Sequence, residues 1–247
     1  MRHVLDDPAW HALIGPLASF AVGSGAARRV SQDHSFFSAI DPASDAVDAA
    51  HDLAALVSEG ERGVLVGLDV SPPPGFSEVG RGTALQMVLE DFVALERVAH
   101  AAIDRNRRER GIDVEVIELG PADVADMLAL IEHARPGPFL ARTIELGTYL
   151  GVREGDELIA MAGERLRPPG FVEVSAVSTH DAHRRRGLAS LVVHGVSTRS
   201  LERGDTPFLH VVTTNVTAIP VYEQLGFRTR AQVNFVAYER TVTPPDA

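Results

Sequence analysis

The chain of 247 residues contains no cysteine. This absence excludes disulfide bridges and thiolate chemistry, argues against redox catalysis by the protein's own side chains, and is compatible with a reducing cytoplasm. The sequence also lacks an apolar run of the ~20 residues that a helix needs to cross a bilayer. Its N-terminus does not combine a basic region with an uninterrupted apolar segment. We therefore expect a soluble, cytoplasmic protein with no membrane partner.

Basic residues are scarcer than acidic ones, with 23 Lys and Arg against 34 Asp and Glu and a net charge of −11. A broad nucleic-acid interface needs a positive surface, so we expect no nucleic-acid partner. The hydrophobic content of 45% is that of a protein with a true core. The length suits one large domain or two small ones.

The first hundred residues mix helical and strand patterns without a motif to which chemistry can be assigned. The period of residues 45–59 predicts a helix that ends at Gly60, with its buried face formed by Val47, Ala50, Leu53, Ala54 and Val57. Residues 63–70 predict a buried strand, and residues 83–92 suit either a strand or the start of a helix. The charged residues 105–111 predict a linker, whose arginines we interpret as a solvated helix end or connector.

From residue 112 the pattern becomes regular. The expected order is a strand, a helix, a helix or turn, two strands, a helix, a strand, a helix and closing strands, at residues 113–119, 121–137, 142–152, 155–166, 171–179, 188–203, 207–213, 215–226 and 227–240. Pro121 suits the start of the first helix, and the Pro-Gly pair at 136–137 suits its end.

The stretch 171–187, FVEVSAVSTHDAHRRRG, joins a strand to a helix through a basic turn. The first amides of a helix have no intrahelical partner, and the helix dipole adds partial positive charge there. Such a junction can bind a phosphate group. The three arginines Arg184, Arg185 and Arg186 add full charges at the same place.

Residues 184–189, RRRGLA, fit the R/Q-x-x-G-x-G/A signature of the GNAT superfamily of acyl-CoA-dependent N-acyltransferases. A second element of that superfamily, N-x-x-A-x-x-x-Y-x-x-x-G-F, is matched by Asn215, Ala218, Tyr222, Gly226 and Phe227. With both motifs in the expected order, residues 112–240 resemble a GNAT domain. The segments 136–139, 142–147 and 161–166 look like the branch similar to glycine N-acyltransferases and their bacterial relatives.

The resemblance implies an α/β (α+β) fold in which helices flank a mixed, mostly antiparallel central sheet. It assigns residues 112–247 to the acetyltransferase domain and residues 105–111 to a linker. Residues 1–104 would then form a smaller α/β region of unclear function, which we interpret as a degenerate relative of the same fold. A homodimer is compatible with this organisation.

The same resemblance implies acetyl-CoA as cosubstrate and assigns residues to it. The backbone of Val177, Ser178 and Thr179 would pair with the pantetheine arm, and the turn from Arg184 to Ala189 would hold the pyrophosphate. Small residues suit such a turn because a side chain keeps the backbone away from the ligand. The full set of expected binding residues is Val177, Ser178, Thr179, Arg184, Arg185, Arg186, Gly187, Leu188, Ala189, Ser190 and Asn215. Arg185 departs from many members, which have glycine there.

Acyl transfer to an amine needs a base for the amine and an acid for the departing thiolate. The resemblance implies Glu173 as the base, on the face of its strand that also carries Ser175 and Val177. It implies Tyr222 as the acid. Alternatively, Glu173 is a solvated carboxylate at a sheet edge and Tyr222 a core aromatic. Pro220 puts the start of the Tyr222 helix in doubt.

Other chemistries have less support in the sequence. His180 and His183 are three residues apart, but no further ligands follow at a matching spacing, so we expect no metal. Ser175 and Ser178 have no nearby His/Asp partners for a nucleophilic serine. No G-x-G-x-x-G follows a strand, which argues against dinucleotide binding.

These observations favour an N-acetyltransferase that moves an acetyl or wider acyl group from its CoA ester to a small primary amine, by direct transfer in a ternary complex. The alternative is a non-catalytic acyl-CoA-binding module with a regulatory N-terminal region. The position of Glu173 and Tyr222 relative to the thioester would discriminate between the two. Because one fold serves many acceptors, the sequence does not choose the amine.

Overall fold

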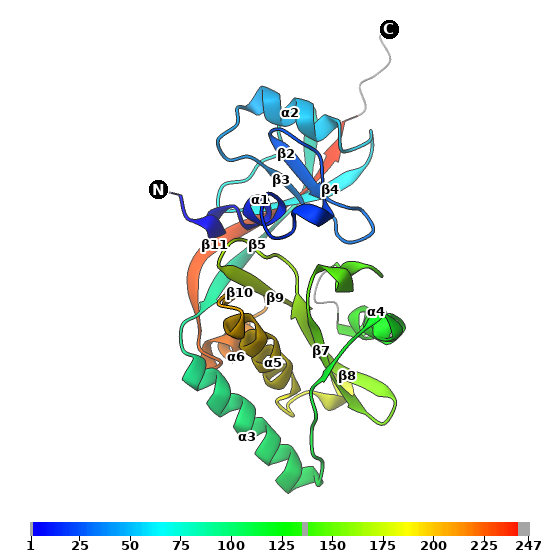
Figure 1. Ribbon diagram of the computed structural model, residues 1–247, viewed down its shortest axis with the longest axis vertical. Helices are drawn as coiled ribbons and strands as arrows, with labels where there is room; N and C mark the ends of the chain where they lie inside the picture. Colours follow the sequence, from blue (N-terminus) through cyan, green and yellow to red (C-terminus); the bar gives the residue numbers. More distant parts are fainter. Residues whose placement is uncertain (1, 135–137, 242–247) are drawn as a thin grey trace. The chain divides into compact units, whose positions relative to one another are not determined.

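The structure of the chain is a computed structural model, which describes residues 2–134 and 138–241 (Figure 1). It forms two compact units. The first unit comprises Met1–Leu85, Leu166–Pro169 and Ala231–Ala247, and the second comprises Gln86–Arg165 and Gly170–Arg230. Two long strands, β5 (Phe76–Leu89) and β11 (Phe227–Arg240), contribute residues to both. None of the helices in the described residues is both long and apolar enough to span a bilayer.

The first unit contains a small antiparallel sheet in the order β1-β2-β3, while β4 pairs antiparallel with β11. Its elements are η1 (Val4–Asp6), α1 (Pro8–Leu13), η2 (Ala18–Phe20), β1 (Ala21–Val22), β2 (Ala27–Val30), β3 (Ser38–Ile40), α2 (Ala46–Ala54) and β4 (Arg62–Gly67). The segment 83–92, which suited a strand or a helix, lies mostly in strand β5. Buried Tyr238 of β11 donates a hydrogen bond to Ser38 Oγ at 2.7 Å.

Helix α2 confirms that a helix forms here, but it ends at Ala54 rather than at Gly60, and its buried face differs from the expected one. The Asp45 side chain caps the helix by accepting from the amides of Val47 and Asp48. Val47 is 75% exposed, whereas Ala49 and Leu53 are buried. Val47, in the first turn of the helix, therefore faces solvent, and the buried face passes through Ala49 and Leu53.

The residues expected to link two domains, 105–111, are instead the end of a 19-residue helix, α3 (Phe92–Arg110). Its buried positions are Ala94 and Leu95 and then, at intervals of three or four residues, Ala99, Ala102 and Asn106. The arginines of its last turn suit the negative end of the helix dipole, and Gly111 ends the helix with a left-handed φ of 66°. The interpretation of this basic cluster as a helix end thus holds, and the units divide elsewhere.

The second unit holds the strand order β5-β10-β9-β8-β7-β6. Strand β9 pairs antiparallel with β8 and parallel with β10, and β8-β7-β6 are antiparallel. The expected class, a mixed and mostly antiparallel sheet flanked by helices, is confirmed. Besides α3, its elements are β6 (Ile117–Glu118), η3 (Pro121–Asp123), α4 (Val124–Ala134), η4 (Thr143–Leu146), β7 (Tyr149–Glu154), β8 (Glu157–Glu164), β9 (Phe171–Thr179), η5 (Asp181–His183), α5 (Leu188–Glu202), β10 (Thr206–Val212) and α6 (Ile219–Gln224).

Several boundaries in this unit differ from the expected ones. The strand expected at 113–119 is only two residues long, and residues 142–152 divide into η4 and strand β7. Residues 227–240 form one strand rather than several. Helix α4 follows a 3-10 turn that begins at Pro121, as the proline predicted. The Pro-Gly pair expected to end it, and part of the segment 136–139, lie outside the described residues.

Helices α4 and α5 cover opposite faces of the second unit's sheet. Tyr149 packs in a cluster with Met127 and Leu130 of α4. The next residue of the strand, Leu150, lies close to Gly195 of α5. Because neighbouring residues in a strand point to opposite faces, the two helices lie on the two sides of the sheet.

Candidate functional site

Strands β9 and β10 pair over a short distance only. The parallel ladder joins Phe171, Val172 and Glu173 to residues 206–208 of β10. Both strands continue beyond it, β9 to Thr179 and β10 to Val212. Past Glu173, the edge of β9 that faced β10 therefore has no strand partner among residues 2–134 and 138–241.

A bulge interrupts β9 just beyond this point. Gly163 of β8 opposes Ser175, and Met161 opposes Ser178, so two residues of β9, Ala176 and Val177, face one residue of β8. Ala176 has a φ of 53°, a value that residues other than glycine rarely adopt. Bulges of this kind redirect side chains and are common beside active sites.

Because of the bulge, Val177 does not lie on the expected face of β9, the face of Glu173 and Ser175. Residues that directly oppose one another across a ladder share a face, so Ser175 and Ser178 both lie on the face of α4, with Met161. Val177 and Thr179 consequently alternate to the other face. An unbroken strand would have placed Val177 beside Glu173, and the extra residue prevents this.

The segment expected to contact pantetheine ends in an unsatisfied hydroxyl. Ser178 Oγ donates to the carbonyl oxygen of Ala176 at 3.1 Å. Thr179 Oγ is buried and has no hydrogen-bond partner among the described residues. Since buried polar atoms are normally paired, this hydroxyl is available to a ligand that the structure does not contain.

The turn before α5 has the geometry of an anion site. Gly187 is the N-cap of α5, with a φ of 76°, and none of the described side chains caps the helix. The first amides of the 15-residue helix therefore combine with the positive end of its dipole. Leu188 and Ser190 point into the protein and are buried, so a ligand here would meet backbone rather than their side chains.

The three arginines of the turn have different environments. Arg186 is buried, with Nη2 3.0 Å from Glu154 Oε1 and Nε 3.1 Å from Asn106 Oδ1. Arg184 is exposed and pairs with Asp181 at 2.7 Å. Arg185 is exposed and has a left-handed φ of 63°. The Arg186 guanidinium, expected at the mouth of the helix, is thus engaged inside the fold.

Glu173 is fully buried, and both of its oxygens are occupied. Arg165 donates from Nη2 to Oε1 at 2.6 Å and from Nε to Oε2 at 2.9 Å. His210 Nδ1 lies 2.7 Å from Oε1. Burial alone would raise the pKa of Glu173, but the Arg165 guanidinium and the His210 ring outweigh it and lower the pKa to about 2.

Hydrogen bonds continue from Glu173 across the sheet. His210 Nε2 lies 3.1 Å from Gln86 Nε2, and Arg230 donates to Gln86 Oε1 at 2.7 Å. Because the Gln86 amide nitrogen can only donate, this order assigns the ring proton of His210 to Nδ1, which donates to Glu173. Glu173 is therefore the acceptor end of a hydrogen-bonded chain, rather than a solvated carboxylate at a sheet edge.

Sequence reasoning missed the two partners of Glu173, Arg165 and His210, and the residues that continue the chain of hydrogen bonds, Gln86 and Arg230. Gln86 and His210 each interrupt an otherwise apolar strand, TALQMVL and PFLHVV. Both side chains are almost fully buried. A polar residue in a buried strand must find a partner, so the interruption itself is the signal that was available.

Tyr222 lies in a shorter helix than expected. The helix α6 begins at Ile219, with Pro220 in its first turn, where a missing amide costs little. Asn215 is not its N-cap. Its Oδ1 accepts from the Ala218 amide at 3.2 Å in the preceding turn. Tyr222 packs edge-on against Phe227, and burial raises the pKa of its hydroxyl to about 12. No hydrogen bond or ion pair joins it to Glu173 among the described residues.

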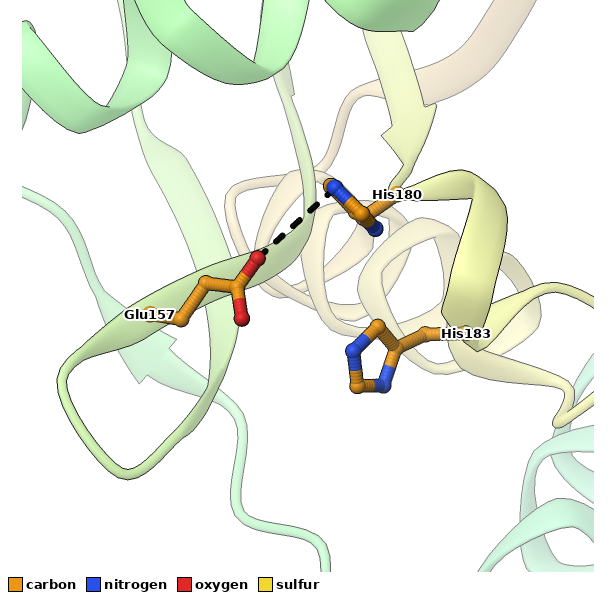
Figure 2. A group of neighbouring side chains, drawn as sticks. All are labelled: Glu157, His180 and His183. Atoms are coloured by element: carbon orange, nitrogen blue, oxygen red, sulfur yellow. Dashed lines mark ion pairs between the residues drawn. The ribbon is translucent and has the colours of Figure 1, made fainter.

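His180 and His183 acquire a third neighbour from another strand (Figure 2). The side chain of Glu157, at the start of β8, points toward them, and its Oε1 lies 3.7 Å from His180 Nε2. One ligand atom from each of the three residues lies within 4.8 Å of the others. The sequence spacing of the two histidines did not reveal this carboxylate, because it comes from 23 residues upstream of His180.

The pKa of Glu173 predicts a stability change in acid. The carboxyl titrates near 4.5 when unfolded and near 2 when folded, so its contribution is present above pH 4.5 and lost as the pH falls toward 2. We expect about 3 kcal/mol of unfolding free energy to be lost over this window. Glu173→Gln should flatten this dependence in urea unfolding, and should also lower stability near neutrality because Arg165 stays buried without its anion. An exposed control, Glu132→Gln, should follow the wild type; parallel curves for Glu173→Gln would contradict the assignment.

The left-handed backbone at Arg185 predicts a difference between two variants that lose the same charge. A left-handed conformation costs a residue with a side chain about 1–2 kcal/mol, and Arg185→Gly removes this cost. Glycine also has more freedom in the unfolded chain, which costs about 0.5–1 kcal/mol on folding. The free energy of unfolding in urea should thus be about 0.5–1 kcal/mol higher for Arg185→Gly than for Arg185→Ala. Arg184, with φ −61°, provides the control, because there alanine should be the more stable. If Arg185→Ala is more stable than Arg185→Gly, the backbone at Arg185 is not strained.

The chain is similar to known proteins in sequence and in fold. A family model described as FR47-like protein matches residues 149–236. None of the curated proteins compared with the chain matches it. Among solved structures, a protein from Novosphingobium aromaticivorans assigned to the GNAT family of acetyltransferases is 33% identical, covers 98% of this chain and 100% of its own, and has a TM-score of 0.81.

Two more distant structures show the same fold. A GCN5-related N-acetyltransferase from Kribbella flavida is 18% identical, with 96% of each chain covered and a TM-score of 0.58. An N-acetyltransferase-like protein from Streptococcus suis is 16% identical, with 94% and 92% covered and a TM-score of 0.58. The narrower likeness to glycine N-acyltransferases stays a prediction. The identity to the Novosphingobium protein over nearly the whole of both chains shows that this chain belongs to the GNAT family of acetyltransferases.

Proposed function

We propose that the chain transfers an acetyl group from acetyl-CoA to a small primary amine by direct transfer in a ternary complex. The observation that carries the proposal is the separation of β9 from β10 beside the uncapped N-terminus of α5. One feature offers an unpaired strand edge and the other an anion site. An extended ligand with amide groups at one end and phosphates at the other matches both.

The residues of this chain fit the cosubstrate at several points. The backbone from Val177 to Thr179 would pair with the pantetheine amides, and the unpartnered Thr179 hydroxyl supplies a further polar contact. The amides from Arg184 to Ala189 would hold the pyrophosphate. Arg184 and Arg185 would add charge from the exposed side of the turn, whereas Arg186 would act by keeping the turn in place through Glu154 and Asn106.

Tyr222 would give its proton to the departing thiolate. A hydroxyl whose pKa is about 12 remains protonated near neutral pH, as an acid must before the reaction. Its half-buried position and its contact with Phe227 fix the ring, which limits the directions in which the hydroxyl points. Asn215, in the preceding turn, would position the helix rather than react.

Glu173 is a poor candidate for direct removal of the amine proton. A carboxylate with a pKa near 2 and with both oxygens hydrogen-bonded has little affinity for a proton. Its role as base stays a prediction, and its contacts support another role. We assign Glu173 as a positioning residue that holds Arg165 and His210 where the two strands separate.

Without a strong base, the amine would have to arrive largely neutral. An alkylamine with a pKa of about 10.4 is neutral in well under 1% of molecules at pH 7, whereas an α-amino group with a pKa of about 7.8 is neutral in about one in seven. The proposal therefore favours acceptors with weakly basic amines, such as amino-acid amides.

The buried state of Glu173 also favours a second candidate function, a non-catalytic acyl-CoA-binding module. Such a module would use the strand edge and the turn but would need no base. It would bind acetyl-CoA with an affinity similar to that of an enzyme and release no thiol. Binding and turnover must therefore be measured separately.

The first experiment follows thiol release from acetyl-CoA with a panel of primary amines of graded pKa, alongside acetyl-CoA binding by calorimetry. We expect binding, and turnover whose kcat/KM rises with pH through the pKa of each acceptor, because only the neutral amine attacks. Binding with no turnover across the panel would favour the module. Absence of both would overturn the assignment of the turn.

The second experiment replaces one hydroxyl. Tyr222→Phe should lower kcat about 100-fold, a typical contribution of a positioned acid, and leave the Kd for acetyl-CoA within about twofold of the wild type. Tyr238→Phe is the matched control, because it removes a buried hydroxyl that bonds Ser38 in the first unit and should affect stability but not kcat. An unchanged kcat in Tyr222→Phe would make Tyr222 a packing aromatic.

A further inference from the structure

A cluster of imidazole and carboxylate groups lies just before the turn of α5. Glu157 begins strand β8, His180 follows strand β9, and His183 ends the 3-10 turn η5. Figure 2 shows the three side chains converging on one space, with Glu157 and His180 joined by their ion pair. Glu157 is exposed, and the two histidines are half-buried. We propose that these residues form a binding site for a divalent transition metal, with Zn²⁺ as the best match.

The separations of these groups suit a shared metal ion. Around tetrahedral zinc, with ligands about 2.1 Å away, two donor atoms are about 3.4 Å apart and two imidazole ring centres about 5.2 Å apart. The donor atoms lie within 4.8 Å of one another, and the ring centres of His180 and His183 are 5.7 Å apart. Small side-chain rotations therefore bring the cluster to coordination distance.

A fourth ligand is available from helix α4. The ring centre of His133 lies 5.4 Å from that of His180. His133 Nδ1 is 2.9 Å from the carbonyl oxygen of Ala129, and a carbonyl can only accept, so the ring proton is on Nδ1. This leaves the Nε2 lone pair for a metal, which is the usual arrangement of a ligating histidine.

A carboxylate also stands behind His183. Its Nδ1 lies 3.2 Å from Glu154 Oε2, which can accept the ring proton when the other nitrogen binds a metal. Arg186 Nη1 lies 2.7 Å from the same Nδ1 and would have to give up that contact. Arg186 keeps its bonds to Glu154 and Asn106, so the exchange costs one hydrogen bond of several.

The donor set selects the type of metal. Imidazole nitrogens favour zinc and its neighbours among transition metals, whereas Mg²⁺ and Ca²⁺ prefer sites made of oxygen atoms. Bound there, the ion would link the start of β8, the turn η5 and the end of α4. The ion would thus cross-link three segments of the second unit.

The test uses the untagged full chain, stripped of metal with a chelator and titrated with ZnCl₂ in a calorimeter. We expect about one equivalent of Zn²⁺ to bind and to raise the Tm, and Mg²⁺ at the same concentration to do neither. His180→Ala and Glu157→Gln should each weaken Zn²⁺ binding at least about tenfold, which is the low end of the loss seen even for residues behind the ligands. Replacement of Zn²⁺ by Co²⁺ should give the intense visible absorption of a tetrahedral site.

Controls separate this site from other histidines of the chain. His51→Ala, an exposed histidine in the first unit, should bind Zn²⁺ as the wild type does, and so should Glu132→Gln, an exposed acid of α4. The unfolding temperature of each metal-free variant checks that it folds. Zn²⁺ binding that is unchanged in both His180→Ala and Glu157→Gln, or that is absent from the wild type, would overturn the proposal.

Discussion

The buried ion pair between Glu173 and Arg165 constrains the arrangement of the strands around it in the second unit. Removing a carboxylate and a guanidinium from water is costly, and only close, multiple hydrogen bonds offset that cost. Arg165 supplies two of them to Glu173, and His210 supplies a third. Since Arg165 follows β8 directly, the pair also fixes how the connection between β8 and β9 begins. The residues around it must therefore keep their places for the pair to remain satisfied.

The position of this pair explains why the strands separate where they do. Glu173 and Phe208 form the last rung of the parallel ladder between β9 and β10. His210, two residues further along β10, still reaches the Glu173 side chain. Three residues further along β9 the chain enters the bulge, where Ala176 and Val177 face a single partner. The network thus holds the strands together at one point, and the bulge turns β9 away beyond it.

Most of the second unit could be predicted from the sequence because its elements carry strong local signals. The period of α5, the alternation of β9 and the turn between them all lie in one continuous stretch, and the motif at Arg184 indicated the family. What the sequence could not supply were the contacts between distant segments. The partner of Glu173 in β10 is 37 residues away, and the carboxylate near His180 comes from a different strand.

The errors have the same origin in local rules that other forces override. Alternation placed Val177 beside Glu173, but one extra residue in β9 reverses the phase. Charge composition made residues 105–111 resemble a linker, yet the same arginines suit the end of a long helix whose other face is apolar. In each case the residue types were interpreted correctly, and the deciding information was which face of the element found a partner.

The arginines of the turn show how little of its positive charge comes from free side chains. Arg186 is neutralised by Glu154 inside the fold, and Arg184 lies against Asp181. If the turn binds pyrophosphate as proposed, the amides of α5 and the helix dipole, which are fixed by the backbone, would attract it together with the exposed Arg185. Gly187 is essential to that backbone because its φ of 76° starts the helix. Arg185 has a similar φ without glycine's freedom, so this chain maintains the geometry of the turn at a cost in strain.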